Sequence, residues 1–297
     1  MVLPTFLGIG APKCATTWLY NCLDDHPEVF MSSVKETDFF VSDTIDGRID
    51  EYAAHFDGAS GEQAVGEVSV WYIHSDVAPE QAYRCLPDAK LFASLRNPID
   101  QTYSYYWHLQ RQNFQGWRLE LVEQIDSFED ALDVIPKKLL KPGYHYRNLQ
   151  RWLQYYDRSQ LHVLLLDDIK EDAGRELGRL YDHIGVDPSF RPESMQDTGR
   201  SARRGTSPRG PLVERVRQHL YVGLNRYLYH PLKRAIGPHT ADRIKEILRL
   251  RQIMERWFRQ EGYPDMNPDT RARLREVFAD DIQRLEEFLG RDLGHWT

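Results

Sequence analysis

The chain has 297 residues, of which 41% are hydrophobic and 28% are charged, a composition typical of a folded globular protein rather than a disordered one. Its 38 Lys and Arg residues against 45 Asp and Glu residues give a formal net charge of −7, which argues against a general nucleic-acid-binding function. Three cysteines exclude a disulfide scaffold, and the sequence has no CxxC or Cys/His cluster that would predict a zinc site.

The beginning of the sequence carries no leader-like pattern, because residues 1–7 have neither a positive n-region nor an extended apolar h-region. The longest aliphatic run, residues 163–166, is far shorter than the roughly 20 residues that a membrane-spanning helix needs. We therefore expect a cytoplasmic protein without a membrane span.

Strand-like and helix-like segments alternate along the chain. Apolar runs predict strands at residues 5–9, 64–70, 90–95 and 161–166. Helical patterns begin at about Thr16 and near Pro98, a residue suited to a first helical turn, and they also cover residues 127–135, 144–156 and 169–184. The alternation predicts an α/β fold with a central parallel sheet flanked by helices. No repeat or linker divides the chain, so we expect a single domain that spans residues 1–297.

The first predicted strand runs into a glycine-containing turn, GIGAPKCATTW at residues 8–18, that opens the first helix. Backbone N–H groups at a helix start point outward, and the helix dipole favours an anion there. Thr16 and Thr17 add hydroxyl donors and Lys13 adds a positive charge, so the turn is predicted to hold a phosphate. It is not the magnesium-dependent Gly-Lys-Ser/Thr loop, because Lys13 lies three residues before Thr16 and no glycine directly precedes it.

The string Pro12-Lys13-x-x-Thr16-Thr17-Trp18 resembles the 5′-phosphosulfate loop of sulfotransferases that use 3′-phosphoadenosine 5′-phosphosulfate (PAPS). Cys14 and Ala15 stand where cytosolic members usually have Ser-Gly, which removes some backbone freedom. The resemblance implies a P-loop-like sulfotransferase fold and a donor-nucleotide site made of Gly10, Pro12, Lys13, Cys14, Ala15, Thr16, Thr17 and Trp18. Trp18 is either a stacking partner for adenine or a core residue. Cys14 lies near a helix N-terminus, where a thiol can become reactive.

A second motif, Arg96-Asn97-Pro98 with Ser104 further along, follows the third predicted strand and opens a helix. Arg96 ends a strand at its carboxyl edge, where open α/β sheets bind ligands. The motif resembles the 3′-phosphate site of the same family, which implies that Arg96 and Ser104 bind that phosphate. On its own, Arg-Asn-Pro is more typical of a capped helix start, so the assignment depends on the first motif.

Two acidic motifs complete the resemblance. KETDFF at residues 35–40 is similar to the Glu-x-x-Phe-Phe string of Golgi-type carbohydrate sulfotransferases such as the heparan sulfate enzymes. That similarity implies that Glu36 is the general base for the acceptor hydroxyl, and Asp38 stands where those enzymes often have histidine. GEVSVWY at residues 66–72 resembles another family segment. In it, Glu67 is an alternative base, a carboxylate that positions the acceptor, or a structural group.

Residues 191–260 differ from the rest in charge, with 16 Lys and Arg against 6 Asp and Glu. This excess indicates either a solvated helical face or a surface that meets an anionic ligand. The resemblance places a nucleotide-closing basic loop near residues 200–210, with Arg203, Arg204 and Gly205 as candidates to bind the 3′-phosphate. Residues 211–297 are expected to form helices of the same domain.

Together these resemblances imply an enzyme that moves a sulfuryl group from PAPS to a hydroxyl of a carbohydrate or a small natural product, and releases adenosine 3′,5′-bisphosphate. Lys13 neutralises the leaving phosphate in this scheme, so no metal is expected. His74, His108 and His145 either line an acceptor pocket or are ordinary histidines. An ATP-dependent kinase on a related P-loop-like fold and a non-catalytic nucleotide-binding protein are the two alternatives. The pattern predicts no oligomeric state.

Overall fold

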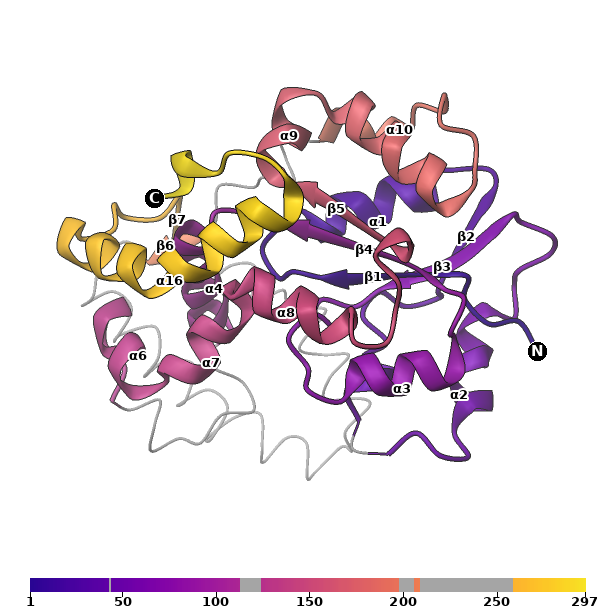
Figure 1. The fold of residues 1–297 in the computed structure, drawn as a ribbon, viewed down its shortest axis with the longest axis horizontal. Coiled ribbons are helices and arrows are strands. Elements are labelled where there is room, and N and C mark those ends of the chain that lie inside the picture. The colour runs from indigo at the N-terminus through magenta and orange to yellow at the C-terminus, as the bar shows by residue number, and fades with distance from the viewer. Residues whose placement is uncertain (43, 113–123, 198–205, 209–258) are drawn as a thin grey trace, which may run out of the picture. The chain divides into compact units, whose positions relative to one another are not determined.

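The computed structural model describes residues 1–42, 44–112, 124–197, 206–208 and 259–297 (Figure 1). Contacts between Cα atoms divide the chain into two compact units. The first unit comprises Met1–Tyr106, Phe128–Arg203 and Met266–Thr297, and the second comprises Trp107–Ser127 and Arg204–Asp265. The parallel sheet belongs entirely to the first unit, which therefore carries the strands that the sequence motifs follow.

Five parallel strands form this sheet, in the order β2-β3-β1-β4-β5. They are β1 (Phe6–Gly10), β2 (Val29–Met31), β3 (Ala64–Val68), β4 (Lys90–Leu95) and β5 (Leu161–Leu165). The four predicted strands are confirmed to within two residues. The short edge strand β2 was not predicted, because three residues are too few to show a period. Every residue of β1 and β3 is buried, as expected where helices cover both faces of a parallel sheet.

The chain leaves the neighbouring strands β1 and β4 in opposite directions. β1 leads through α1 (Thr16–Asp24) to β2 on one side of the sheet order, and β4 leads to β5 on the other side. Such a reversal opens a crevice at the carboxyl ends of the two strands, where open α/β sheets bind ligands. The predicted phosphate turn follows β1 and Arg96 follows β4, so the topology brings these two motifs to the same place.

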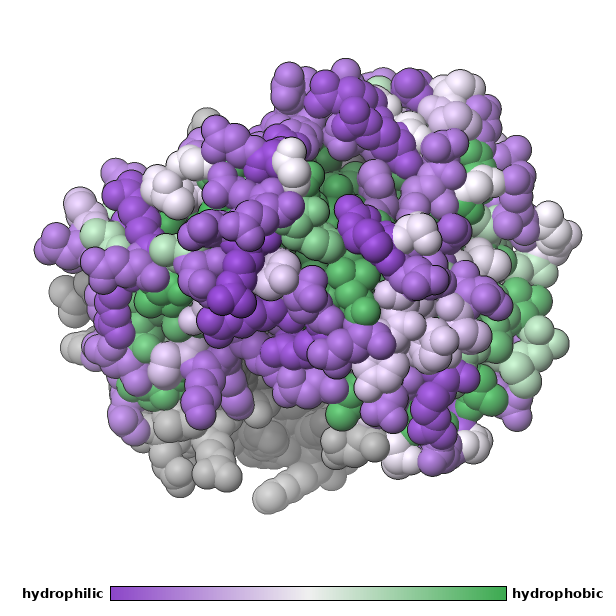
Figure 2. Space-filling model, in the orientation of Figure 1, coloured by the Kyte–Doolittle hydropathy of each residue, from purple (hydrophilic) through white to green (hydrophobic). Residues whose placement is uncertain are grey.

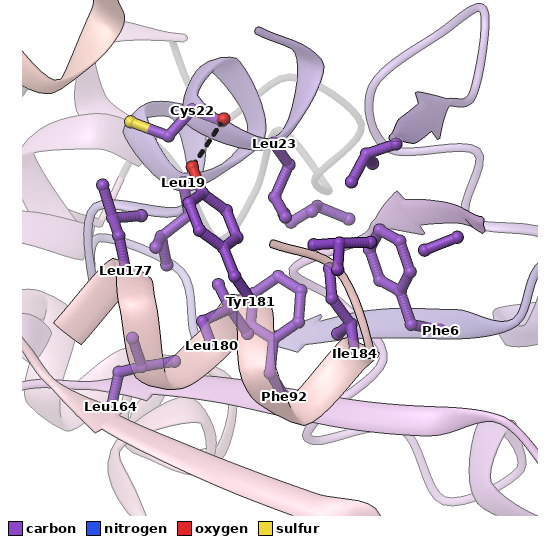
Figure 3. Close-up of a cluster of buried hydrophobic side chains, with 14 of the residues drawn as sticks. Phe6, Leu19, Cys22, Leu23, Phe92, Leu164, Leu177, Leu180, Tyr181 and Ile184 are labelled. Atoms are coloured by element: carbon purple, nitrogen blue, oxygen red, sulfur yellow. Dashed lines mark hydrogen bonds between the residues drawn. The ribbon is translucent and has the colours of Figure 1, made fainter. Parts of the chain in front are cut away.

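A cluster of buried apolar side chains joins β1 and β4 to two helices on one face of the sheet, α1 and α10 (Ala173–Ile184). Figure 3 shows Leu177, Leu180 and Tyr181 of α10 directed toward α1 and the strands. The Tyr181 hydroxyl donates a hydrogen bond to the Cys22 carbonyl at 2.9 Å, which links the two helices. This packing fixes the start of α1, and with it the predicted phosphate turn, relative to the sheet.

The opposite face of the sheet is covered by α3 (Ala78–Cys85) and α8 (His145–Trp152) (Figure 1). The reversal of strand order explains the two layers, because right-handed crossovers in opposite directions place their helices on opposite faces. The predicted helix at residues 144–156 is thus present but ends four residues early, at Trp152.

One expected helix, residues 169–184, is two helices in the structure, α9 (Leu166–Glu171) and α10. The break falls at Asp172, whose carboxylate accepts a hydrogen bond from the Arg175 backbone N–H at 2.9 Å. Aspartate is a preferred N-cap, so it starts a new helix even where the apolar period continues. The remaining α-helices of the described segments are α2 (Ile49–Ala53), α4 (Pro98–Arg111), α6 (Phe128–Val134), α7 (Pro136–Leu140) and α16 (Pro268–Leu289).

In the second unit, the described residues include an antiparallel pair of short strands, β6 (Thr206–Pro208) and β7 (Arg259–Glu261). The rings of Trp107 and Tyr263 stack there, with their centroids 5.8 Å apart and their planes 10° from parallel. The stacking of Trp107 on Tyr263 joins two segments of the unit that are more than 150 residues apart in sequence.

The surface is predominantly polar on the face that Figure 2 shows, where hydrophilic side chains cover most of the view and hydrophobic ones lie between them. Within the described ranges, no helix combines the length and the apolar character that crossing a bilayer requires.

Candidate active site

The turn between β1 and α1 is held in place by side chains of β4 and α4. The Ser94 hydroxyl donates to the Cys14 carbonyl at 2.6 Å, and the Gln101 amide nitrogen donates to the Pro12 carbonyl at 3.0 Å. The Ala11 N–H donates to the Ser94 carbonyl at 2.8 Å. Ser94 and Gln101 are at most 1% exposed, so these bonds are shielded from water. They fix the backbone of the turn against β4 and α4.

The helix that follows the turn begins without a conventional cap. Ala15 is its N-cap residue, and among the described residues no side chain caps it. The first N–H groups of a helix have no intrahelical acceptor, so this end of α1 is suited to bind an anion. Thr16 is buried at the first helical position and the next residue, Thr17, is exposed.

Two residues of the turn have left-handed backbone angles, Lys13 with φ 68° and Ala15 with φ 60°. Ala15 stands where the resemblance to cytosolic sulfotransferases implies glycine, and it takes up the left-handed conformation that glycine adopts freely. For a residue with a Cβ atom this costs roughly 1–2 kcal/mol. Gly10 has φ 136°, and a Cβ there would lie 2.9 Å from the Ile73 side chain, so this position requires glycine.

The Cys14 thiol is not a reactive group in this fold, contrary to the expectation from its place near a helix N-terminus. It is fully buried and donates to the Pro12 carbonyl at 3.5 Å. Burial raises the pKa of Cys14 to about 12, and the nearby charges of Arg96 and Lys13 lower it only in part. The hydrogen bonds of Ser94 to Cys14 and Ala11 place the end of β4, and Arg96 two residues further on, beside this turn.

Arg96 lies at the end of β4, half-exposed, directly before α4. The Asn97 side-chain oxygen accepts a hydrogen bond from the Ile99 N–H at 2.9 Å, so the Arg-Asn-Pro string is also a capped helix start, as its residues suggest. Ser104 is on the same helix and is 6% exposed. The structure therefore brings Lys13 and Arg96 to the same edge of the sheet, at the carboxyl ends of the neighbouring strands β1 and β4.

The segment at residues 35–40 runs along the end of β3. The Glu36 N–H donates to the Val68 carbonyl at 3.1 Å, and both Glu36 (φ 64°) and Asp38 (φ 51°) have left-handed backbone angles. The Glu36 carboxylate forms an ion pair with the neighbouring Lys35 and remains 36% exposed. It is therefore an accessible carboxylate on a sharply bent backbone.

Glu67 differs completely from Glu36, since it is 0% exposed and accepts four hydrogen bonds from hydroxyl groups. The donors are Tyr52 at 2.6 Å and Tyr72 at 2.8 Å to one carboxylate oxygen, and Thr37 at 2.6 Å and Ser69 at 2.9 Å to the other. Two acceptor positions on each oxygen are thus occupied. Because Thr37 lies between Glu36 and Asp38, Glu67 ties the bent segment to the sheet.

Asp38 is surrounded by negative charge. Burial raises its pKa to about 6, with further contributions from the carboxylates of Glu36 and Glu67. Its backbone N–H donates to the Ser69 hydroxyl at 3.2 Å, while its Oδ1 atom is buried and has no hydrogen-bond partner within the described part of the chain. Asp38 therefore holds a proton more readily than an ordinary aspartate does.

Trp18 belongs to the core cluster. It is 1% exposed, and its indole N–H donates to the Ser194 carbonyl at 3.0 Å. The basic candidates Arg203, Arg204 and Gly205 lie outside the described residues, as does most of the basic stretch at 191–260.

Several residues that shape the site carry no recognised motif. Ser94 and Gln101 hold the turn, and Tyr52 binds Glu67. Ser94 is a polar residue within the apolar run of β4, and Gln101 lies one helical turn after Pro98, among residues of α4 that are buried. A polar side chain on a buried face implies a fixed hydrogen bond, and this signal would have identified both.

A family model of the sulfotransferase domain matches residues 4–203, about two thirds of the chain. The chain belongs to the sulfotransferase family. Sulfuryl transfer, with PAPS as the donor, is the activity that this family implies.

Curated relatives and a solved structure agree with this assignment. The chain is 29% identical over 199 residues to the bifunctional heparan sulfate N-deacetylase/N-sulfotransferase 4 of Mus musculus, covering 63% of this chain and 23% of the relative. It is 31% identical over 195 residues to enzyme 1 of the same name from Homo sapiens, covering 62% and 22%. The sulfotransferase thus spans less than a quarter of the length of these relatives. A crystal structure of a sulfotransferase from Alicyclobacillus acidocaldarius shares the fold, with a TM-score of 0.67, 24% identity and coverage of 100% of this chain and 99% of that one.

Proposed function

We propose that this sulfotransferase transfers the sulfuryl group of PAPS to a hydroxyl group of a carbohydrate or of a small natural-product metabolite, and releases adenosine 3′,5′-bisphosphate. One observation carries the proposal: the turn with Lys13 and the β4 end with Arg96 meet at the strand-order reversal, where Ser94, two residues before Arg96, donates a hydrogen bond to the Cys14 carbonyl at 2.6 Å. A ligand with phosphate groups at both ends of a ribose matches two adjoining cationic positions.

The donor nucleotide is held at its two phosphates. The 5′-phosphate binds the turn at residues 10–18 through backbone N–H groups and the hydroxyls of Thr16 and Thr17, at the N-terminus of α1. The 3′-phosphate binds Arg96 and Ser104, together with the basic loop that contains Arg203, Arg204 and Gly205. Lys13 neutralises the charge that develops on the oxygen bridging sulfur and the 5′-phosphate, which is why the reaction proceeds without a metal.

Glu36 is the general base. The acceptor oxygen forms a bond to sulfur while the bond from sulfur to the bridging phosphate oxygen breaks, the proton of the acceptor passes to the Glu36 carboxylate, and the electron pair stays on the phosphate. Glu36 suits this role because it is accessible and not saturated with donors. Glu67, with four hydroxyl donors, anchors the segment that carries the base.

We also propose that residues 1–297 act as one sulfotransferase domain in the cytoplasm, with the basic loop near 200–210 closing over the nucleotide and residues 211–297 completing the same domain. A sugar acceptor is supported by the similarity of residues 35–40 to carbohydrate sulfotransferases. The relatives are named as N-sulfotransferases, so amino sugars belong in the acceptor test beside hydroxyl compounds.

The test is a transfer assay with PAPS labelled in its sulfuryl group, applied to a library of sugars, amino sugars, phenols, lipids and polyketides. Mass spectrometry detects the addition of one sulfuryl group. Turnover that requires PAPS, is unaffected by a metal chelator and is lost in Lys13→Ala supports the proposal. Phosphate transfer from magnesium-ATP would instead indicate a kinase. Binding of adenosine 3′,5′-bisphosphate without transfer to any acceptor would indicate a non-catalytic protein.

A further inference from the structure

The corner that carries Arg96 is held by a segment almost 200 residues away in sequence. The Asn97 side-chain nitrogen donates a hydrogen bond to the Trp296 carbonyl at 3.1 Å, while the same side chain caps α4 through its oxygen. On the other side of the corner, His145 at the start of α8 donates through Nε2 to the Arg96 carbonyl at 2.8 Å, because a carbonyl can only accept. The corner is thus held from two directions, through the Arg96 backbone carbonyl and the Asn97 side chain.

Trp296 is itself firmly placed. It is 1% exposed, and its indole N–H donates to the Asp167 carboxylate at 3.0 Å, directly after β5. Its ring meets that of His145 edge to face, with the centroids 6.1 Å apart. Arg291, five residues earlier, forms a two-oxygen ion pair with Asp168. The segment after α16 is therefore attached to the β5–α9 junction before it reaches Asn97.

The side chain of Arg96 contrasts with its backbone. Across the residues that the structure describes, its guanidinium group has neither a hydrogen-bond nor an ion-pair partner, although its carbonyl and the side chain of the next residue, Asn97, are both held by hydrogen bonds. A cation that has no protein partner and extends from a fixed corner of the chain can bind an anion at a lower entropic cost. The chain around it is already ordered before the ligand binds.

We propose that Asn97, His145 and Trp296 are positioning residues that aim Arg96 at the 3′-phosphate of the donor nucleotide. This inference rests on the proposed role of Arg96. Trp296 and the segment around it lie beyond residues 4–203, where the match to the family model ends, so this support comes from a part of the chain outside that match. Discrimination between nucleotides with and without a 3′-phosphate then depends on a tryptophan that contacts no phosphate.

The experiment compares the affinity of the full chain for adenosine 3′,5′-bisphosphate and for AMP by isothermal titration calorimetry. Trp296→Phe keeps an aromatic ring and removes the bond to Asp167. Asn97→Ser keeps a residue that caps helices well and removes the donor to Trp296. Each change is expected to weaken binding of the bisphosphate about tenfold, and binding of AMP less than about twofold, since only the former uses Arg96 fully.

Tyr156→Phe is the matched control. Tyr156 is an equally buried aromatic residue (1% exposed), and the change removes one hydrogen bond, 3.1 Å to the carbonyl of Leu86, which precedes the other end of β4. Both affinities are expected to stay within about twofold of the unchanged chain. Thermal unfolding of every variant shows whether a loss of affinity reflects a loss of folded protein.

Arg96→Ala tests the 3′-phosphate site separately from the positioning role of Asn97 and Trp296. If it weakens the bisphosphate selectively and neither Trp296→Phe nor Asn97→Ser does, the positioning role is wrong and the 3′-phosphate site stands. If Arg96→Ala weakens both nucleotides equally, the site assignment fails and the positioning role fails with it. Equal losses for both nucleotides in Trp296→Phe and Asn97→Ser would show that the segment only stabilises the fold.

Discussion

The donor side and the acceptor side of this site are built in different ways. The turn at residues 10–16 is held by neutral groups, Ser94 and Gln101, that bind its carbonyls. The segment at residues 35–40 is held by a buried carboxylate, Glu67, that collects hydroxyl groups. Each segment contains two non-glycine residues with left-handed backbone angles. This conformation is strained, so each segment needs support from the surrounding structure.

The difference follows from the charge that each side presents. A turn that receives phosphate must show N–H groups and cations, and an anion used as its anchor would repel the ligand. A segment that presents a general base tolerates acidic neighbours. Asp38 lies among them, and burial, with further contributions from the carboxylates of Glu36 and Glu67, raises its pKa to about 6.

The largest expected effect is on the acceptor side. Glu36→Gln removes the base and is expected to lower kcat roughly 10²–10⁴-fold, because general base catalysis contributes about that much. Binding of adenosine 3′,5′-bisphosphate should not change, since Glu36 is not on the donor side. Steady-state kinetics and calorimetry on the same preparation measure both. An unchanged kcat would transfer the role of base to another carboxylate.

The charged anchor Glu67 is expected to contribute more to the free energy of unfolding than the neutral anchor Ser94. Glu67→Gln puts an amide nitrogen, which cannot accept, in place of one oxygen that has two donors. We expect the loss of these two bonds to lower the free energy of unfolding by about 3 kcal/mol, since hydrogen bonds to charged groups contribute roughly 1.5–3 kcal/mol each. Ser94→Ala removes one neutral bond on the donor side, with an expected loss of about 1 kcal/mol. Urea unfolding measures both values. Equal losses would contradict the distinction between a charged and a neutral anchor.

A pH effect of intermediate size is expected at the donor corner. Burial lowers the pKa of His145 to about 4, whereas an unfolded chain has a histidine pKa of about 6.5. The unfolded state therefore binds the extra proton first, and stability that is complete above pH 6.5 is lost as the pH falls toward 4. From pH 7 to pH 5 the contribution of His145 is a loss of about 2 kcal/mol.

His145→Gln provides the comparison for that effect. Glutamine can donate to a carbonyl but does not titrate, so the variant should lose about 2 kcal/mol less than the unchanged chain between pH 7 and pH 5. Urea unfolding at the two pH values gives the difference. His74 and His162, whose pKa values burial also lowers to about 4, contribute to both curves equally. Identical losses in the two proteins would exclude His145 as a source of acid sensitivity.

The smallest expected effect concerns backbone strain in the donor turn. Ala15 has φ 60° and stands where the resemblance to cytosolic sulfotransferases implies glycine. Ala15→Gly should raise the free energy of unfolding by up to about 1 kcal/mol, because glycine adopts this conformation without strain while losing more entropy on folding. Urea unfolding measures the change.

Ala53→Gly, in the helix α2, is the control for this last prediction. Ala53 has the ordinary helical φ of −59°, so glycine relieves no strain there and should lower the free energy of unfolding by roughly 0.5–1 kcal/mol. The two alanine-to-glycine changes should therefore have opposite signs. A loss of stability in Ala15→Gly would show that the strain at this position is negligible.

Much of the framework could be predicted from local patterns. The strands β1, β3, β4 and β5 are mostly apolar segments of five or six residues, and the start of α1 at Thr16 follows from the turn before it. The break between α9 and α10 could not be read from periodicity, because the apolar period continues through Asp172 while its capping bond interrupts the helix. At Asp172 the helical apolar period favours one long helix, whereas the capping hydrogen bond to Arg175 starts a second one.

The sequence by itself determined which residues carry charge and hydroxyl groups, and in which strand-to-helix turns they lie, since these depend on neighbours along the chain. Only the tertiary structure decided how the two glutamates differ, with Glu36 accessible and Glu67 enclosed by four hydroxyls, and that Trp296 supports the corner of Arg96. Burial and hydrogen-bond partners arise from packing between distant segments, and no local pattern contains that information.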